Sequence, residues 1–374
     1  MALSKIQGIE GQVTPNLGRR NLIINGAMQV SQRGTDINDI AADNTYIMDR
    51  FLTRDYGGDG TYDYDQSTDV PTATFQNSIK LTCKSASTNT GTYGYSIEQR
   101  IEGYNVRQLR LGRSNAQPIT VSFWVKSSIA GTYSTGMRTT SAQYSYVTEF
   151  ALSANTWTYI TYTAPALTTA LSNLQEDHTG AGILLDLLVL GKQTGKATST
   201  LNAWQAGNYV SSTNQVAWMD NANATVNVTG VQVEAGDTAT PFEHRSYVEE
   251  LTACQRYCNV IGNDAHYTAL GLGTMYTTTN GIFYVTTATS MRTTPSLTTI
   301  AASSGSNSGK WLNSYVGSTG TITNAVPQLG ENSTNGLSNS FRIYVPSSNS
   351  STTIGFSTWN MVITGARFIL SAEL

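Results

Sequence analysis

Apolar and polar residues alternate with the period of a β-strand along most of this chain. The clearest run is Thr225 to Val233, in which four valines fall at or near every second position. Side chains two apart share one face of a strand, and β-branched residues suit a pleated sheet, so this run predicts the last strand of a sheet. Similar short runs, such as Ile119 to Val125, recur about every 10–12 residues between Gly, Ser and Asn turns. This spacing is typical of an all-β sandwich.

One stretch has the period of a helix instead. Ser246 is followed three residues later by Glu249, the capping-box pair that begins a helix. Apolar residues at i, i+4, i+7 and i+11 then predict a single apolar stripe. The residues of this stripe are Tyr247, Leu251, Cys254 and Cys258. We therefore expect one short helix over 246–260.

Several local signals refine this picture. Asn280-Gly281 is the strongest two-residue hairpin signal, and Asp59-Gly60 is a second one. The apolar run from Ile183 to Leu190 predicts either a strand buried on both faces or a short buried helix. It is far too short to span a membrane.

Composition narrows the class of protein. Charged residues make up only 13% of the chain, about half the usual quarter, although the mean hydropathy is −0.22. Thr, Ser, Asn, Gln and Gly therefore supply the polarity. Hydrophobic residues at 39%, with 20 Tyr and 6 Trp, are enough to fill cores and argue against disorder. A net charge of −3 without a basic run argues against nucleic-acid binding, which needs cations to neutralise phosphates.

Catalytic and metal-binding signals are weak. No Gly-x-Ser-x-Gly or phosphate-binding Gly-x-x-x-x-Gly-Lys motif occurs. The five aspartates between Asp55 and Asp69 lack the spacing of a calcium loop, so an exposed acidic loop is the simpler interpretation. The three histidines show no ligand spacing, and we expect no metal, no cofactor and no catalytic residue. We expect Cys83, Cys254 and Cys258 to be buried free thiols.

Two motifs resemble those of tailed-bacteriophage tail-fibre or appendage proteins. The first reads NLIINGAMQV at 21–30, QRG at 32–34 and MDRF at 48–51. The second reads VQVE at 231–234, TPFEHRSY at 240–247, EEL at 249–251 and CQRY at 254–257. WQAGNY at 204–209, MRTTP at 291–295 and AEL at 372–374 also fit that group. The resemblance covers roughly Asn21 to Tyr257.

The resemblance implies a virion structural protein with a jelly roll like that of carbohydrate-binding modules. Its domains would be an N-terminal virion anchor or leader over 1–20, the jelly roll over 21–245, the linker helix over 246–260 and a second, smaller β-sandwich-like domain over 261–374. The protein would be made in the host cytoplasm without a signal peptide and released by lysis. Its partners would be other tail or capsid proteins, a host surface glycan and copies of itself, with a trimer favoured. No nucleic acid and no membrane insertion are expected.

Binding of a glycan would use exposed aromatic rings for stacking and polar side chains for hydroxyls. The candidate rings are Tyr62, Tyr64, Tyr93, Tyr95, Tyr144, Tyr146, Trp204, Tyr209 and Trp218. Further candidates in the C-terminal region are Tyr267, Tyr276, Trp311, Tyr315 and Trp359. The alternative for each is a place in a core or a subunit interface, and we expect Trp124 and Trp157 in the core.

Three other functions stay open from the sequence. A purely structural virion component, such as a capsid decoration, head fibre or tail adaptor, would use the same jelly roll as a scaffold. A glycan-cleaving enzyme would need two carboxylates at a set separation, which the sequence does not place. A carbohydrate-binding module of a secreted cellular enzyme is a third. The ion pairs expected among Arg245, Glu243, Glu249 and Glu250 favour none of these functions over the others.

Overall fold

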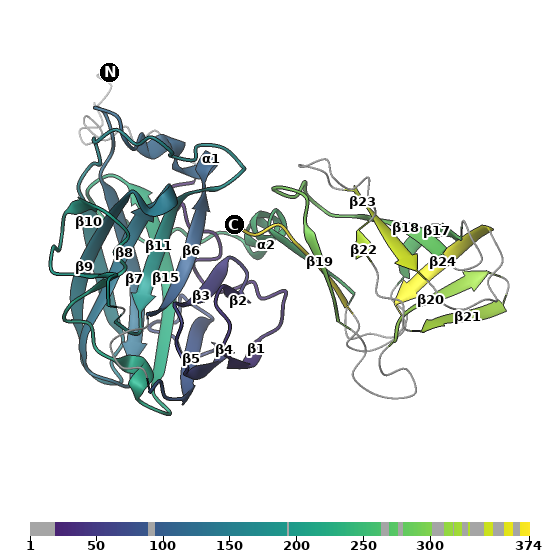
Figure 1. Ribbon diagram of the computed structural model, residues 1–374, viewed down its shortest axis with the longest axis horizontal. Helices are drawn as coiled ribbons and strands as arrows, with labels where there is room; N and C mark the ends of the chain where they lie inside the picture. Colours follow the sequence, from purple (N-terminus) through teal and green to yellow (C-terminus); the bar gives the residue numbers. More distant parts are fainter. Residues whose placement is uncertain are drawn as a thin grey trace, which may run out of the picture.

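The computed structural model describes residues 19–88, 94–192, 194–262, 269–275, 280–300, 310–316, 318–323, 328–329, 340–346, 355–361 and 367–374. Strands dominate this part of the chain, as the alternating pattern predicts (Figure 1). Its two α-helices are α1 (Gly103–Val106) and α2 (Tyr247–Gln255). Among the described residues, neither α-helix is long and apolar enough to cross a membrane.

Two antiparallel sheets form the N-terminal jelly-roll β-sandwich. Sheet A has six strands in the order β1-β4-β5-β15-β7-β10, and sheet B has seven in the order β13-β9-β8-β11-β6-β3-β2. The strands of sheet A are β1 (Asp36–Ile40), β4 (Thr61–Ser67), β5 (Ser78–Ser85), β15 (Thr225–Ala235), β7 (Ile119–Ser127) and β10 (Thr158–Ala164). Those of sheet B are β13 (Trp204–Ala206), β9 (Tyr144–Leu152), β8 (Gly131–Thr139), β11 (Ala181–Val189), β6 (Tyr95–Glu102), β3 (Phe51–Asp55) and β2 (Thr45–Met48).

The core lies between these two sheets. Phe123 of β7 meets Phe150 of β9 at a ring-centroid distance of 5.8 Å, and Phe150 stacks on Tyr133 of β8 at 6.1 Å. The valines of β15 are fully buried against this layer. The apolar run from Ile183 to Leu190 supplies β11, the central strand of sheet B, which decides between its two predicted structures in favour of a strand.

Short segments complete the sandwich. Three 3₁₀ turns occur in its described part, at Arg107–Leu109, Thr140–Ala142 and Trp218–Asp220. The short strands β12 (Ala197–Thr198) and β14 (Ser211–Ser212) form a parallel pair outside the two main sheets.

The C-terminal region is also made of β-sheet, so the expected fold class is confirmed. A three-stranded sheet contains β16 (Cys258–Ile261), β25 (Arg367–Ser371) and β19 (Ser296–Ile300). A seven-stranded sheet contains β21 (Ser318–Thr323), β20 (Lys310–Val316), β24 (Gly355–Met361), β17 (Ala269–Met275), β18 (Asn280–Thr286), β23 (Ser340–Pro346) and β22 (Gln328–Leu329). The exact domain boundaries stay a prediction.

Helix α2 begins as expected but buries a different face. The Glu249 amide donates to the Ser246 hydroxyl at 3.3 Å, and the Ser246 amide donates back to the Glu249 carboxylate at 2.9 Å, which confirms the capping box. The predicted apolar stripe is wrong, because Tyr247 is 54% exposed while Glu250 is buried. The helix also ends at Gln255, so that Cys258 lies in β16. Polar partners for Glu250 make this burial favourable. All three cysteines are buried free thiols, as expected.

One of the two predicted hairpins is present. The consecutive strands β17 and β18 pair antiparallel, as predicted, but Asn280 and Gly281 lie within β18 and do not form its turn. The second hairpin prediction is wrong. Asp59 and Gly60 lie between β3 of sheet B and β4 of sheet A, so this turn carries the chain from one sheet to the other. Short turn signals report a change of direction but not which strands pair.

The two motifs of the sequence analysis meet in space. The Asn21 side chain donates to the carbonyl of Val231 at 3.0 Å and accepts from the amide of Val233 at 3.0 Å. The Glu243 carboxylate accepts the amides of Arg20 and Asn21 at 3.1 Å each. The N-terminal motif therefore runs along the end of β15, held by the segment that leads to α2.

The Arg245 and Glu250 side chains extend this contact. Arg245 forms ion pairs with Glu243 and Glu250, each at 2.9 Å. The other carboxylate oxygen of Glu250 accepts the amide of Asn25. Part of the expected ion-pair network is thus present and more buried than expected, but Glu249 caps the helix instead of joining it.

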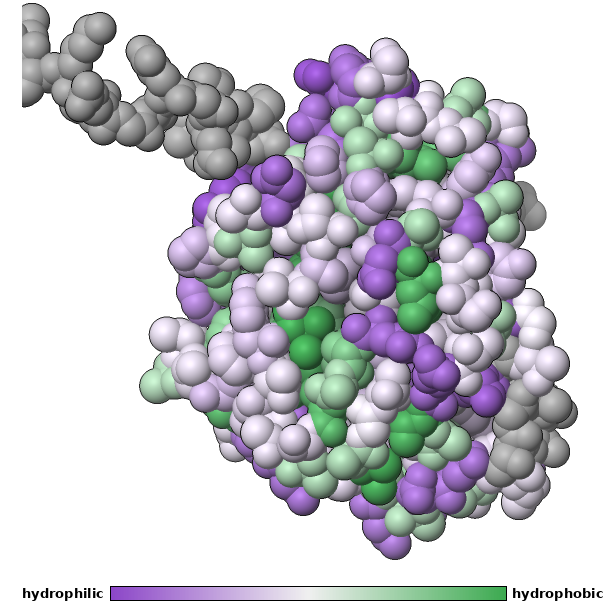
Figure 2. All heavy atoms as spheres, turned by 90° about the vertical axis from the view of Figure 1, so that its left-hand side faces the viewer, coloured by the Kyte–Doolittle hydropathy of each residue, from purple (hydrophilic) through white to green (hydrophobic). Residues whose placement is uncertain are grey.

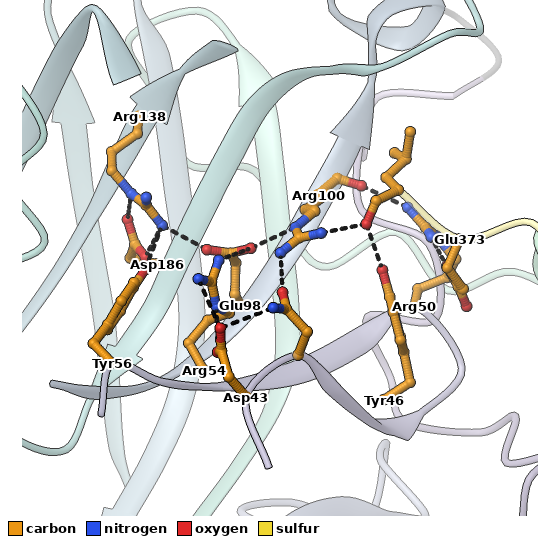
Figure 3. A network of polar contacts seen from close by, with 12 residues as sticks. Asp43, Tyr46, Arg50, Arg54, Tyr56, Glu98, Arg100, Arg138, Asp186 and Glu373 are labelled. Carbon is orange, nitrogen blue, oxygen red and sulfur yellow. Dashed lines mark hydrogen bonds and ion pairs between the residues drawn. The ribbon is translucent and has the colours of Figure 1, made fainter. Parts of the chain in front are cut away.

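The end of the chain enters the same region. The buried Arg50 pairs with Glu373, which also accepts from Arg33 at 3.2 Å. The Arg50 guanidinium lies 3.6 Å from the centroid of the Tyr257 ring. In Figure 1 the C-terminus lies beside α2, and Figure 3 shows Glu373 held by Arg50 close to Tyr46. We call Arg33, Arg50, Glu102, Tyr257 and Glu373 the junction.

Glu102 and Arg292 complete the connections around the junction. Glu102 accepts from Arg256 at 2.6 and 3.0 Å and from the Tyr257 hydroxyl. Although burial disfavours the charged carboxylate, these donors outweigh it and lower the pKa of Glu102. Arg292 donates to the carbonyls of Ala372 and Glu373 at 2.8 Å each. Sheet B, α2 and the last residues of the chain are thereby joined by charge-assisted hydrogen bonds.

Removing Arg50 from its buried ion pair with Glu373 should destabilise the protein strongly. We expect Arg50→Met to lower the free energy of unfolding by about 3 kcal/mol, because the Glu373 carboxylate would stay buried with a weaker set of donors. The double variant Arg50→Met/Glu373→Met should lose less than Arg50→Met alone. Urea unfolding checks both, with exposed Arg110→Met as the control. Equal losses in the single and double variants would contradict a paired role.

Candidate functional site

The structure buries most of the aromatic side chains predicted to bind a glycan. Each buried ring is at most 2% exposed, so none of them can offer a face to a sugar. The buried rings are Tyr62, Tyr64, Tyr95, Tyr146 and Trp218. The prediction for these five is corrected: they pack in the core, which was the alternative left open. Tyr93 lies outside the described residues.

Strand orientation explains this burial. On β4, Tyr62 and Tyr64 point into the core while Asp63 and Asp65 point outward. The Tyr62 ring meets the edge of the Tyr95 ring at 6.3 Å, and Tyr146 stacks on Tyr162 at 5.9 Å. Same-face pairs were therefore read correctly from the sequence, but the sequence does not state which face each pair occupies.

The remaining candidates lie around the edge formed by β9 and β13. Tyr144, Trp204 and Tyr209 are half-buried, and the Trp204 indole donates to the carbonyl of Pro165 at 2.7 Å. Trp204 pairs with Tyr146 and Ala206 with Tyr144, so Trp204 and Tyr144 share one face of this edge. The C-terminal candidates Tyr267, Tyr276, Trp311, Tyr315 and Trp359 fall outside the residues whose side chains the structure describes.

The outer face of sheet B is covered by the chain itself. Residues 194–217 run over β8 and β9, where Gln215 accepts from the amide and the hydroxyl of Ser134 at 2.7 Å each. The amide of Ser212 donates to the Ser134 hydroxyl at 2.9 Å, and the amide of Tyr209 donates to the Ser145 hydroxyl at 2.8 Å. These bonds leave the middle of this face closed to a ligand.

A buried charge network lies on the same face (Figure 3). Arg138 of β8 pairs with Glu98 of β6 and with Asp186 of β11 at 2.5 and 2.7 Å. Burial raises the pKa of Asp186 to about 6, against the lowering effect of Arg138. Both carboxylates are fully buried and share one arginine, so this pair holds the sheet together and has no room for a glycosidic bond between its members.

The outer face of sheet A, in contrast, presents aromatic rings to solvent. Trp124 of β7 lies across from Tyr159 of β10, with ring centroids 5.1 Å apart and planes tilted by 47°. Beside them, the Lys126 ammonium lies 5.3 Å from the centre of the Trp157 ring. Tyr159 is 42% exposed. We call Asp69, Trp124, Lys126, Trp157 and Tyr159 the sheet A patch.

Asp69 holds the polar side of this patch. Its carboxylate accepts from the Trp157 indole at 3.1 Å and from the Lys126 ammonium. Partial burial alone would raise the pKa of Asp69, but these two donors outweigh it and lower that pKa. The patch therefore combines flat apolar rings with an ionised acceptor and a cation, a set that suits a ring-shaped ligand with many hydroxyls.

The expectation that Trp124 and Trp157 lie in the core is wrong. Val121, Phe123 and Val125 fill the core side of β7, so the alternate residues, including Trp124, must face outward. On β15, the neighbour of β7, a β-bulge at Gly230 (φ 66°) lies next to Trp124. A Cβ added at Gly230 would lie 2.8 Å from the ring of Phe75. The alternation of ITVSFWVK at 119–126 already indicates this outward position, because Trp124 is on the same strand face as Thr120 and Ser122.

The surface on the β9 and β10 side and the search for metal ligands give no further candidate site among the described residues. Figure 2 shows the side on which β9 and β10 lie in Figure 1, where hydrophobic residues form separate spots among polar ones. Within the described ranges, no three His, Cys, Asp or Glu side chains gather as they would around a metal ion.

Comparison with known proteins gives only distant likenesses. No family model and no curated protein matches this chain. A putative sugar-binding protein from Bacteroides thetaiotaomicron is 14% identical, with 58% of this chain covering 100% of that one at a TM-score of 0.32. The family 11 carbohydrate-binding module of a Clostridium thermocellum cellulase is 9% identical, with coverages of 55% and 99% and a TM-score of 0.26.

An arabinose-bound α-L-arabinofuranosidase gives a similar likeness. It is 9% identical, with 59% of this chain covering 30% of that one at a TM-score of 0.31. The chain thus spans about a third of that enzyme's length. Sugar-binding proteins and carbohydrate-binding modules recur among these structures. The similarities are so low that any ligand of this chain has to be argued from its own residues.

The buried Trp218 and the half-buried Trp124 should contribute differently to the free energy of unfolding. We expect Trp218→Ala to lower the free energy of unfolding by about 3–5 kcal/mol, because it empties a fully buried site. Trp124→Ala should cost about 1 kcal/mol, since the ring is partly in solvent already. Urea unfolding followed by circular dichroism measures both values. Similar losses for the two variants would place Trp124 in the core after all.

Proposed function

We propose that this chain is a non-catalytic glycan-binding protein whose jelly roll binds saccharide at the sheet A patch. One observation carries the proposal: the half-buried Trp124 and Trp157 and the 42% exposed Tyr159 stand together at the β7–β10 edge of sheet A. A sugar ring has apolar C–H faces that pack on aromatic rings and hydroxyls that need polar partners. The patch supplies both kinds of contact within a few residues.

Rigidity of the patch supports this function. Trp124 and Tyr159 are directly paired residues of the β7–β10 ladder, and the Trp157 indole is held by Asp69. A site whose rings are already in place loses little conformational entropy when a ligand binds. The patch can therefore bind without a rearrangement of the fold.

We further propose that the protein acts in a bacteriophage virion, as a tail fibre or appendage that attaches to a host surface glycan. The two sequence motifs support this, since they resemble tail-fibre proteins and interlock here through Asn21, Glu243 and Arg245. The remaining parts of this proposal are an N-terminal anchor to other virion proteins and a homotrimer.

A second candidate is a purely structural virion component. The closed outer face of sheet B and the charged junction favour this second candidate, because the polar groups of both bond to other parts of the same chain. The two candidates differ in the sheet A patch, which only an adhesin needs to keep open.

Substitutions in the patch should weaken binding without unfolding the protein. We expect Trp124→Ala and Tyr159→Ala each to weaken binding to host surface polysaccharide about tenfold, since a stacked ring contributes about 1.5 kcal/mol. Tyr247→Ala is the matched control, because Tyr247 is 54% exposed on α2. Binding to host cells and to a glycan array measures the effect.

Each outcome of this experiment separates the candidates. Saturable binding that survives both substitutions would move the glycan site elsewhere. A folded protein that binds no host glycan would support the structural component. Release of new reducing ends from the polysaccharide would instead reveal a glycan-cleaving enzyme.

The proposed trimer makes a direct prediction about mass. We expect multi-angle light scattering to give about three times the chain mass of 40.3 kDa at micromolar concentration. The value should persist on dilution, because fibre subunits associate over large symmetric interfaces. A mass of one chain would contradict the trimer and leave the proposal of glycan binding standing.

A further inference from the structure

Two adjoining hollows lie on the surface beside α1, away from the sheet A patch. Their volumes are about 370 and 430 Å³, within the usual range for small-ligand sites. Both are lined by Arg19, Ile24, Tyr104, Asn105 and Ala253. We call the two hollows together the arginine groove, because Arg19, Arg107, Arg245 and Arg256 all lie on its walls.

Three separate segments build this groove. The N-terminal motif supplies Arg19 and Ile24, the turn of α1 and the following 3₁₀ helix supplies Tyr104 and Arg107, and α2 supplies Ala253. Each segment is fixed by the contacts of the folded module, since Glu243 holds the amide of Asn21. The groove is therefore formed before any ligand arrives.

Two of the four arginines are already neutralised. Arg245 pairs with Glu243 and Glu250, and Arg256 pairs with Glu102. These carboxylates balance the charges that hold α2 in place. The Nε of Arg245 is nevertheless buried without a hydrogen-bond partner among the described residues, which leaves one donor unused at the groove wall.

The other two arginines keep their charge for a ligand. Arg107 donates to the carbonyl of Glu176 at 2.5 Å and lies 4.7 Å from the centroid of the Tyr104 ring, but within the described residues it has no ion pair. The nearby Glu176 carboxylate pairs with Arg113 at 2.6 Å, and Glu249 is used as the cap of α2. Arg19 is exposed and has no ion pair in the described part of the chain. Asp177 and Glu249 attract Arg107 and Arg19 electrostatically, but neither carboxylate lines the groove. Among the described charged groups that do line it, Arg19 and Arg107 are the ones without an ion pair.

We propose that the arginine groove binds the carboxylate of an acidic sugar. A guanidinium presents two parallel N–H donors that match a carboxylate in geometry and charge. Tyr104 is 43% exposed and, with the exposed Asn105, offers polar groups to sugar hydroxyls. Ile24 and Ala253 add apolar surface to the lining of both hollows, against which the face of a sugar ring can pack. This site is independent of the sheet A patch.

A matched pair of probes tests the proposal. We expect a short oligogalacturonate to bind the full-length protein in isothermal titration calorimetry, and its methyl ester to bind at least tenfold more weakly. The ester keeps the sugar ring and removes only the charge. Affinity for the acid should fall as salt rises, because the contact is between charges.

Variants locate the site. Arg107→Gln and Arg19→Gln should each weaken oligogalacturonate binding about fivefold to tenfold. Arg110→Gln is the control, since Arg110 is exposed in the same turn and does not line the groove. Trp124→Ala should leave this binding unchanged, which keeps failure of the groove distinct from failure of the sheet A patch.

Three results would overturn the proposal. The first is a folded protein that does not bind oligogalacturonate. The second is equal binding of the acid and its methyl ester, or affinity unchanged in both arginine variants. The third is inorganic phosphate competing as well as the oligosaccharide at equal concentration, which would reduce the groove to a simple anion site.

Discussion

The burial of charge at the junction is the constraint on which the arrangement of this chain depends. Arg50 and Glu373 are both nearly inaccessible, and a charge taken out of water is tolerated only with a partner. The partners come from segments more than 300 residues apart in sequence. The N-terminal motif, α2 and the last residues must therefore be placed together.

Buried ion pairs also distinguish the outer face of sheet B from that of sheet A. Only 13% of the residues are charged, and many of them are spent in buried pairs on sheet B, such as Arg138 with Glu98 and Asp186. That face is then closed by residues 194–217. On sheet A, Phe75 packs beside Gly230 and Trp124 and the outward side chains of β15 are also buried. The most exposed ring there is that of Tyr159 on the edge strand β10, so the proposed saccharide site is confined to the β7–β10 edge.

The sequence predicts the elements well and their partners poorly. Alternation gave β-structure, the capping box gave the start of α2, and ITVSFWVK contained the outward position of Trp124. Asn280-Gly281 correctly indicated that β17 and β18 pair, whereas Asp59-Gly60 joins strands of different sheets, because a turn signal does not specify which strands pair. Tyr62 and Tyr64 could not be placed, since period two fixes a shared face without saying which face meets the core. The junction depends on contacts across the whole chain, which no local pattern encodes.

The two proposed sites use different physics, and this follows from where they lie. The sheet A patch stands on paired strands, where flat rings are held rigidly and its two charges, Asp69 and Lys126, pair with each other, so it suits the apolar face of a sugar. The arginine groove borders α2, where guanidinium groups already gather to neutralise Glu102, Glu243 and Glu250. Holding α2 requires several arginines in one place. Arg19 and Arg107 line the same groove without an ion pair among the described residues, and their guanidinium groups are what would attract an anion.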